Sequence, residues 1–177
     1  MSKRYFLFLA ISVVFITVIL ATRTPEVKQT QLLERNAELS SLAEWSNTRD
    51  AVRNLQLQLK SKPSDIKIKL LLIQAYIQEG RVTGNHAYYD AIAFKLVNEI
   101  LKDDPSHFEA LCCMATLQAS AHQFSEALIT SDIAIKINPF NSYIYGVKCD
   151  ALTELGKYKE AIATADKMVS IRPDLRS

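Results

Sequence analysis

The regular spacing of four prolines most constrains what this chain can fold into. These residues are Pro63, Pro105, Pro139 and Pro173. They are separated by 42, 34 and 34 residues, and a period of this length is typical of arrays of two-helix repeats. Twelve residues before each proline stands an alanine, which predicts a close approach of two helix backbones because a larger side chain would push them apart. The four alanines are Ala51, Ala93, Ala127 and Ala161.

Each half of a unit carries the pattern of an amphipathic helix. In the last unit, apolar residues from Leu152 to Val169 recur at spacings of three and four, which predicts one apolar stripe on each of two helices. Gly156 separates these halves and suits the left-handed conformation that ends a helix. We expect Gly80 and His122 to do the same in earlier units. Two further small residues, 24 positions before the last two prolines, are expected to pack between helices: Ala115 and Cys149.

Two units carry motifs that resemble the tetratricopeptide repeat. One has Leu155-Gly-Lys-Tyr-xx-Ala161 with a closing Ile171-Arg-Pro173, and the other has Phe124-Ser-Glu-Ala127 with Ile137-Asn-Pro139. The resemblance extends over residues 32–175 and, with the amino-terminal segment, looks like that of a membrane-anchored bacterial member of the family. It implies an all-α superhelix of helix-turn-helix units whose role is to bind proteins.

Three segments are expected along the chain. They are a membrane anchor or signal peptide at 1–22, a polar linker at 23–31, and the repeat domain at 32–177 with units at about 32–65, 66–107, 108–141 and 142–175. In the first unit, Asn47-Thr48 can break the chain into two helices, and Trp45 beside it is expected to pack. The alternative is a coiled segment over residues 31–60 that pairs with a second copy. The alanine and proline register favours the repeat.

The segment Tyr5–Ala21 contains no charged residue. As a helix its 17 residues would span about 26 Å, near the ~30 Å hydrocarbon core of a bilayer. Lys3 and Arg4 precede it, which predicts a cytoplasmic amino end and an extracytoplasmic repeat domain, periplasmic in a Gram-negative cell. The alternatives are a cleaved signal peptide and a buried helix of the domain. We favour the single-pass anchor because the apolar run is long for a signal peptide.

The second unit holds eight more residues than the later ones, around Arg81–Tyr89. Gly84-Asn85 is a turn signal within it. An insertion between two helices projects from one edge of a repeat array, so His86 and the tyrosines could form a contact loop. The alternative, which we favour, is that the tyrosines extend the second helix and pack on Tyr76 or Phe94.

Composition and motifs argue against nucleic-acid binding and catalysis. Apart from Lys3 and Arg4, the chain has 19 basic and 19 acidic residues, so it offers no basic surface for nucleic acid. None of the three histidines is paired with a cysteine or a carboxylate at the spacing of metal ligands, and the sequence contains no common catalytic motif. We therefore predict no enzyme, cofactor or metal. Cys112 and Cys113 are adjacent and should not form a disulfide with each other. Two alternatives remain for the three cysteines: a disulfide between Cys113 and Cys149, or packing of all three as small apolar residues.

The resemblance implies that the first helix of each unit lines a concave groove that binds a peptide or a helix of a protein partner. The groove candidates transferred by helix position are Lys67, Leu70, Gln74, Gln78, Glu109, Cys112, Thr116, Ser120, Tyr143, Gly146, Asp150 and Glu154. The alternative function is a structural homo-oligomer that self-associates through residues 26–60 or through an uncovered carboxyl-terminal face. Arrays of this kind normally end in a solvating helix, which the sequence does not show after Pro173.

Overall fold

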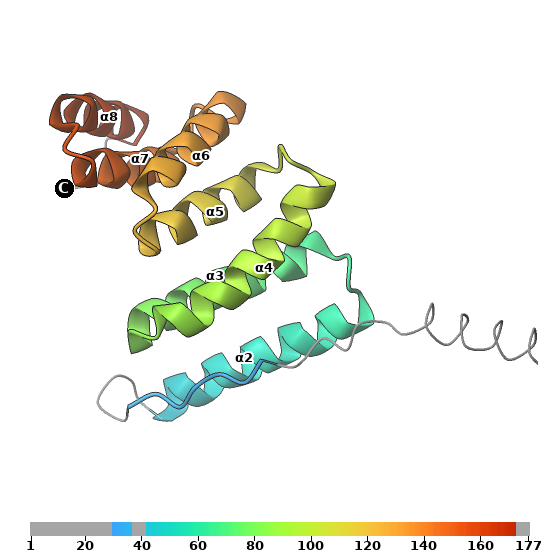
Figure 1. Cartoon of the computed structure of the whole chain (residues 1–177). Helices are drawn as coiled ribbons and strands as arrows, with labels where there is room; N and C mark the ends of the chain where they lie inside the picture. Colours follow the sequence, from blue (N-terminus) through green and yellow to red (C-terminus); the bar gives the residue numbers. More distant parts are fainter. Residues whose placement is uncertain (1–29, 37–41, 173–177) are drawn as a thin grey trace, which may run out of the picture. The chain divides into compact units, whose positions relative to one another are not determined.

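The described residues, 30–36 and 42–172 of the computed structural model, contain seven α-helices and no strand (Figure 1). The predicted all-α class is therefore confirmed for this part of the chain. The chain divides into two units, residues 1–32 and 33–177, and the second holds all seven helices. The helices are α2 (Leu42–Ser61), α3 (Ile66–Thr83), α4 (His86–Asp103), α5 (Phe108–Ser120), α6 (Phe124–Ile137), α7 (Ser142–Glu154) and α8 (Tyr158–Ile171).

The membrane anchor predicted at residues 5–21 lies outside the described residues, as does most of the linker at 23–31. Within the described ranges, no helix is long and apolar enough to cross a membrane.

Helices α3 to α8 form three successive hairpins, in which α3 packs on α4, α5 on α6, and α7 on α8. The second helix of one hairpin contacts the first helix of the next, and the first helices also contact one another along the array. Each of α2, α4 and α6 ends two residues before a proline, namely Pro63, Pro105 and Pro139. Pro173 lies outside the described residues.

The alanines of the repeat register differ in burial. Ala93 and Ala127 are fully buried and Ala161 is 5% exposed. Ala115 is also fully buried, and Cys149 is partly buried on α7. Ala51 is exposed on α2, so the close helix approach expected there was wrong. Among the described residues of the first unit, α2 has no partner helix that could pack on this alanine.

The described residues of the first unit, 30–36 and 42–61, contain one helix, α2, where a helix pair was expected. The break expected at Asn47-Thr48 was wrong, because α2 runs through it. Trp45, Val52 and Leu59 are buried at intervals of seven residues, so one apolar stripe continues across both polar residues. Continuous packing of this stripe outweighs the weak helix preference of Asn and Thr.

Two of the three residues expected to end first helices in the left-handed conformation do so. Gly156 has φ +72° after α7, and His122 has φ +58° after α5. In the second unit, the left-handed residue that ends the first helix is Gly84, with φ +71°. The prediction that Gly80 ends this helix was wrong. Gly80 is buried inside α3, where an added Cβ would meet the His86 Nδ1 at 3.3 Å. It allows α3 and α4 to approach closely.

The eight extra residues of the second unit lengthen both of its helices. Helices α3 and α4 have 18 residues each, against 13 and 14 in the later hairpins. Alignment with α5 and α6 places the added helical residues at 79–83 and 86–89, nine in all, while the turn between the two helices is one residue shorter than in the next hairpin. The contact-loop alternative was wrong, and the packing alternative is confirmed: Tyr89 is fully buried and its ring stacks on Tyr76 at 6.3 Å between centroids.

Residues 33–36, which we call the strap, pack against these added turns. The Leu33 N–H donates to the Tyr89 hydroxyl at 2.9 Å. The Arg35 guanidinium donates two hydrogen bonds to Glu79, with Nε 3.0 Å from Oε2. The Trp45 ring covers the guanidinium, with its centroid 5.1 Å from Cζ. Both anchors of the strap, Tyr89 and Glu79, therefore belong to residues that the 34-residue units lack.

Candidate functional site

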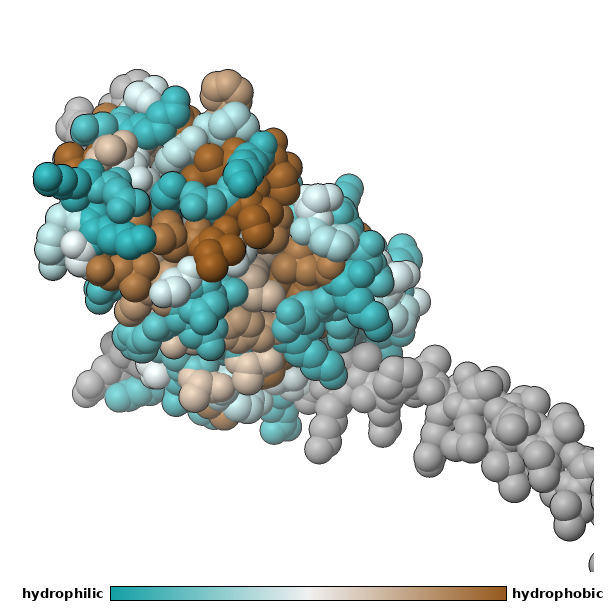
Figure 2. Space-filling view, turned by 45° about the horizontal axis from the view of Figure 1, so that its top comes forward, coloured by the Kyte–Doolittle hydropathy of each residue, from teal (hydrophilic) through white to brown (hydrophobic). Residues whose placement is uncertain are grey.

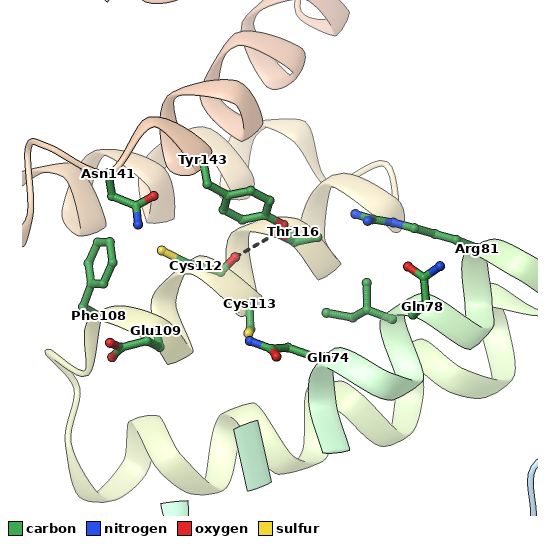
Figure 3. A pocket seen from close by; sticks show the side chains of 11 residues that line it. Gln74, Gln78, Arg81, Phe108, Glu109, Cys112, Cys113, Thr116, Asn141 and Tyr143 are labelled. Carbon is green, nitrogen blue, oxygen red and sulfur yellow. Dashed lines mark hydrogen bonds between the residues drawn. The ribbon is translucent and has the colours of Figure 1, made fainter. Parts of the chain in front are cut away.

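A cleft of about 400 Å³ opens along the first helices of the three hairpins (Figure 3). Helix α3 provides one side, α5 the floor, and the start of α7 the other side. Its lining residues are Gln74, Ile77, Gln78 and Arg81 on α3, Phe108, Glu109, Cys112, Cys113 and Thr116 on α5, and Asn141 and Tyr143 at the start of α7.

The floor of the cleft, which α5 provides, is largely apolar. Cys112 and Cys113 are each 8% exposed. The Thr116 hydroxyl lies one turn further along, and it donates to the Cys112 carbonyl oxygen at 2.9 Å. Its oxygen lies 2.8 Å from the Tyr143 hydroxyl. This second bond fixes the Tyr143 ring as a wall of the cleft.

The two ends of the cleft carry opposite charges. Arg81 extends at the α3 end, whereas Glu109 lies on the far side of the floor (Figure 3). Between them, the amides of Gln74 and Gln78 face the opening. Asn141 uses its Oδ1 to accept from the Ile144 N–H at 3.3 Å, which leaves its NH₂ group to donate. The cleft thus offers hydrogen-bonding amides above an apolar floor, between a cation and an anion.

The two cleft cysteines are poor nucleophiles and poor metal ligands. Burial raises the pKa of the Cys112 thiol to about 12, with Cys113 and Glu109 adding to the shift, and burial raises the pKa of Cys113 to about 11. A thiol that stays protonated at neutral pH neither attacks nor ligates readily. Cys112, Cys113 and Cys149 are all free. Within the described residues, no group of three or more His, Cys, Asp or Glu side chains could hold a metal ion.

Six of the predicted groove residues come together in this cleft. They are Gln74, Gln78, Glu109, Cys112, Thr116 and Tyr143. The other six do not line it: Lys67, Leu70, Ser120, Gly146, Asp150 and Glu154. Ser120 instead joins α5 to α4, because its hydroxyl donates to Asp90 Oδ2 at 2.7 Å and lies 3.2 Å from His86 Nδ1.

Sequence reasoning missed five residues of the lining: Ile77, Arg81, Phe108, Cys113 and Asn141. Arg81 lies three residues after Gln78, so extending the helical stripe by one turn would have found it. Asn141 precedes the first helical residue of α7, and its role as the helix cap was a usable signal.

Comparison with known proteins identifies the fold but no family. No protein-family model and no curated protein matches the chain. Among solved structures, a crystal structure of MamA is 17% identical with a TM-score of 0.62, covering 81% of this chain and 78% of that one. MamA structures of AMB-1 and MSR-1 are 15% and 16% identical, each with a TM-score of 0.57. They cover 78% and 76% of this chain, and 73% and 72% of their own. The likeness shows a tetratricopeptide-like helical fold.

Proposed function

We propose that this chain is a non-enzymatic scaffold that binds a segment of a protein partner in the cleft between α3, α5 and α7. The observation that carries the proposal is the lining of this cleft, which three successive first helices supply. Clefts of this size that combine an apolar floor with a few polar groups are the usual form of binding sites.

The lining favours an extended peptide of mixed charge. Gln74, Gln78 and Asn141 provide amides that can pair with a peptide backbone. The floor around Phe108 and Cys112 suits one apolar side chain of the peptide. An acidic residue toward Arg81 and a basic residue toward Glu109 would complement the charges at the two ends and fix the direction of the bound segment.

The proposed scaffold is held at a membrane by residues 5–21. The uncharged run and the preceding Lys3 and Arg4 support a single-pass anchor with a cytoplasmic amino end. Thiol labelling of intact cells with a membrane-impermeant reagent would test this topology, using Ser2→Cys and, on the exposed side of α8, Ala163→Cys. Labelling of the second site alone is expected, and labelling of the first alone would overturn the orientation.

The function is tested by affinity purification of the tagged full-length chain from gently solubilised membranes, with mass spectrometry of the proteins that accompany it. Arg81→Glu and Tyr143→Ala should each lose the partner, because they reverse one end charge and remove one wall. Arg53→Glu changes an exposed arginine on α2, away from the cleft, and should keep the partner. Equal recovery by all variants would show that the cleft is not the binding site.

A structural homo-oligomer is the second candidate. The observation in its favour is the exposure of Tyr158, Ile162 and Val169 on α8, at 64%, 64% and 41%. Positions equivalent to Ile162 and Val169 are at least half-buried in α4 and α6, where the next hairpin covers them. Recovery of this chain alone, from wild type and cleft variants alike, would favour the homo-oligomer.

A further inference from the structure

Helix α6 carries an apolar stripe that faces away from its neighbours. Ile129, Ile133 and Ile137 are 62%, 42% and 44% exposed, and their spacing of four residues places them in one row along the helix. We call them the isoleucine stripe. Phe140, in the turn that follows, is 77% exposed. In Figure 2, hydrophobic residues gather in the upper half of the view. None of these four residues lines the cleft.

The repeat itself shows that the fold does not require this stripe. The buried alanines Ala93, Ala127 and Ala161 set the register between α4, α6 and α8. In this register, the stripe positions are occupied on the two flanking second helices by Lys95, Glu99 and Asp103 on α4 and by Ala163, Lys167 and Ile171 on α8. Four of these six residues are charged and a fifth is alanine, so only one is a large apolar residue. Helix α6 is therefore isoleucine at all three positions where its equivalents are mostly charged.

The stripe also differs from the exposed apolar face of α8. Ile162 and Val169 of α8 occupy positions that pack against the following hairpin in α4 and α6, so their apolar character follows from the repeat. The isoleucine stripe has no such explanation. An exposed apolar row on a surface that is otherwise polar typically marks an interaction site.

We propose that the isoleucine stripe is a dimer interface, which packs against the same stripe of a second copy in antiparallel orientation about a two-fold axis near Ile133. A row of residues spaced by four forms a ridge that fits the groove beside an identical ridge. An axis at Ile133 brings it against its own copy and sets Ile129 against Ile137 of the second chain. Such a two-fold contact is self-complementary and closes after two copies.

The charges at the two ends of α6 favour the antiparallel orientation of the second copy over the parallel one. Glu126 lies near the start of the helix and Lys136 near its end, both exposed. Antiparallel packing brings unlike ends of two such helices together, and it also opposes their dipoles. Parallel packing would bring like ends together. Because the cleft lies on α3, α5 and α7, both clefts stay open in the dimer, and the inference does not depend on the proposed function.

Disulfide cross-linking of the full-length chain in membranes tests the interface. Ile133→Cys is expected to give a cross-linked dimer under mild oxidation. Ile129→Cys and Ile137→Cys, expressed together with different tags, are expected to cross-link to each other at least tenfold more than either does to itself. Ala163→Cys, at the exposed position equivalent to Ile129 on α8, is the matched control. The wild-type chain gives the background of the native cysteines, of which Cys112 and Cys113 are buried.

A charge placed in the stripe provides an independent test. Ile133→Lys should reduce the Ile129→Cys with Ile137→Cys cross-link at least tenfold, whereas Ala163→Lys should leave it unchanged. Because both positions are exposed, neither change should alter the helix content measured by circular dichroism. Three results would overturn the proposal: no cross-link above the Ala163→Cys control, self-cross-linking at Ile129→Cys that equals the mixed reaction, or a cross-link that persists with Ile133→Lys. The last result would instead indicate α8 or residues 26–60.

Discussion

The Tyr143 hydroxyl donates to the Thr116 hydroxyl oxygen at 2.8 Å and so joins the start of α7 to the third turn of α5. The direction follows from the neighbouring bond, because Thr116 donates its own proton to the Cys112 carbonyl oxygen. Tyr143 is 52% exposed, yet its ring is held at both ends. A partner that enters the cleft therefore meets an aromatic wall already in place, and little ordering of this side chain opposes binding.

Tyr143→Phe should lower the free energy of unfolding by about 1 kcal/mol or less, the usual contribution of one hydrogen bond with access to water. Urea denaturation of the purified chain measures this difference. Tyr158→Phe is the matched control, because Tyr158 is 64% exposed and should change by less than Tyr143→Phe. Equal losses in the two variants would show that the bond to Thr116 does not contribute.

Arg35→Ala should lower the free energy of unfolding by about 3–5 kcal/mol, because it leaves the carboxylate of Glu79 buried without a partner. Glu79 is 1% exposed. Replacing both residues by leucine should recover much of the loss, since two apolar side chains leave no unpaired charge. The control is Arg49→Ala, which removes an exposed ion pair with Glu34 at 3.7 Å and should cost about 0–1 kcal/mol. A similar small loss for Arg35→Ala would refute the buried role of the pair.

His122→Gly should raise the free energy of unfolding by about 1 kcal/mol, because glycine adopts positive φ without the strain of a Cβ. The loss of the edge contact between His122 and Phe124, with centroids 5.5 Å apart, opposes this gain only in part. Gly156→Ala is the reverse experiment. No atom lies within 4 Å of an added Cβ at Gly156, so its loss of stability reports the backbone alone. Thermal unfolding of both variants should shift in opposite directions.

Asp150→Asn should stabilise the chain more at neutral pH than at acidic pH. Partial burial raises the pKa of the Asp150 carboxyl, and Glu154 raises it further. The folded state then binds this proton more tightly than the unfolded state, so stability decreases as pH rises through the raised pKa. Asparagine does not ionise, so the variant does not lose this stability as the pH rises. Urea denaturation between about pH 4 and 7 should show that the gain from Asp150→Asn grows with pH; Asp166→Asn on α8 is measured beside it as the reference substitution.

The local features of the fold were predictable from sequence, and the long-range ones were not. The proline spacing and the glycine at 156 report events within one repeat, where pattern and structure are directly linked. The continuity of α2 through Asn47-Thr48 was missed because it is decided by the tertiary burial of Trp45, Val52 and Leu59. The strap was missed for a similar reason, since Arg35 and Glu79 are 44 residues apart and no periodicity connects them.

About half of the cleft lining was predicted. Equivalent positions on the first helices identify the correct face of each helix, but they do not show how far along the helix the cleft extends. Tyr143, at the start of α7, contacts Thr116 in the third turn of α5, so consecutive first helices are staggered. The stagger moves the lining toward the start of α7, which leaves Asp150 and Glu154 outside. On α3 it moves the lining toward the end of the helix, which leaves out Lys67 and includes Arg81.

The added turns of α3 and α4 have a consequence for how such a protein can change over generations. An ancestor with a 34-residue second unit would have had neither Glu79 nor Tyr89 to receive the strap. A descendant that lost the strap but kept the longer hairpin would have the Glu79 carboxylate buried without its Arg35 partner. The codons for Arg35 and Glu79 stand 44 positions apart in the gene, yet selection is expected to gain, keep or discard the two segments together.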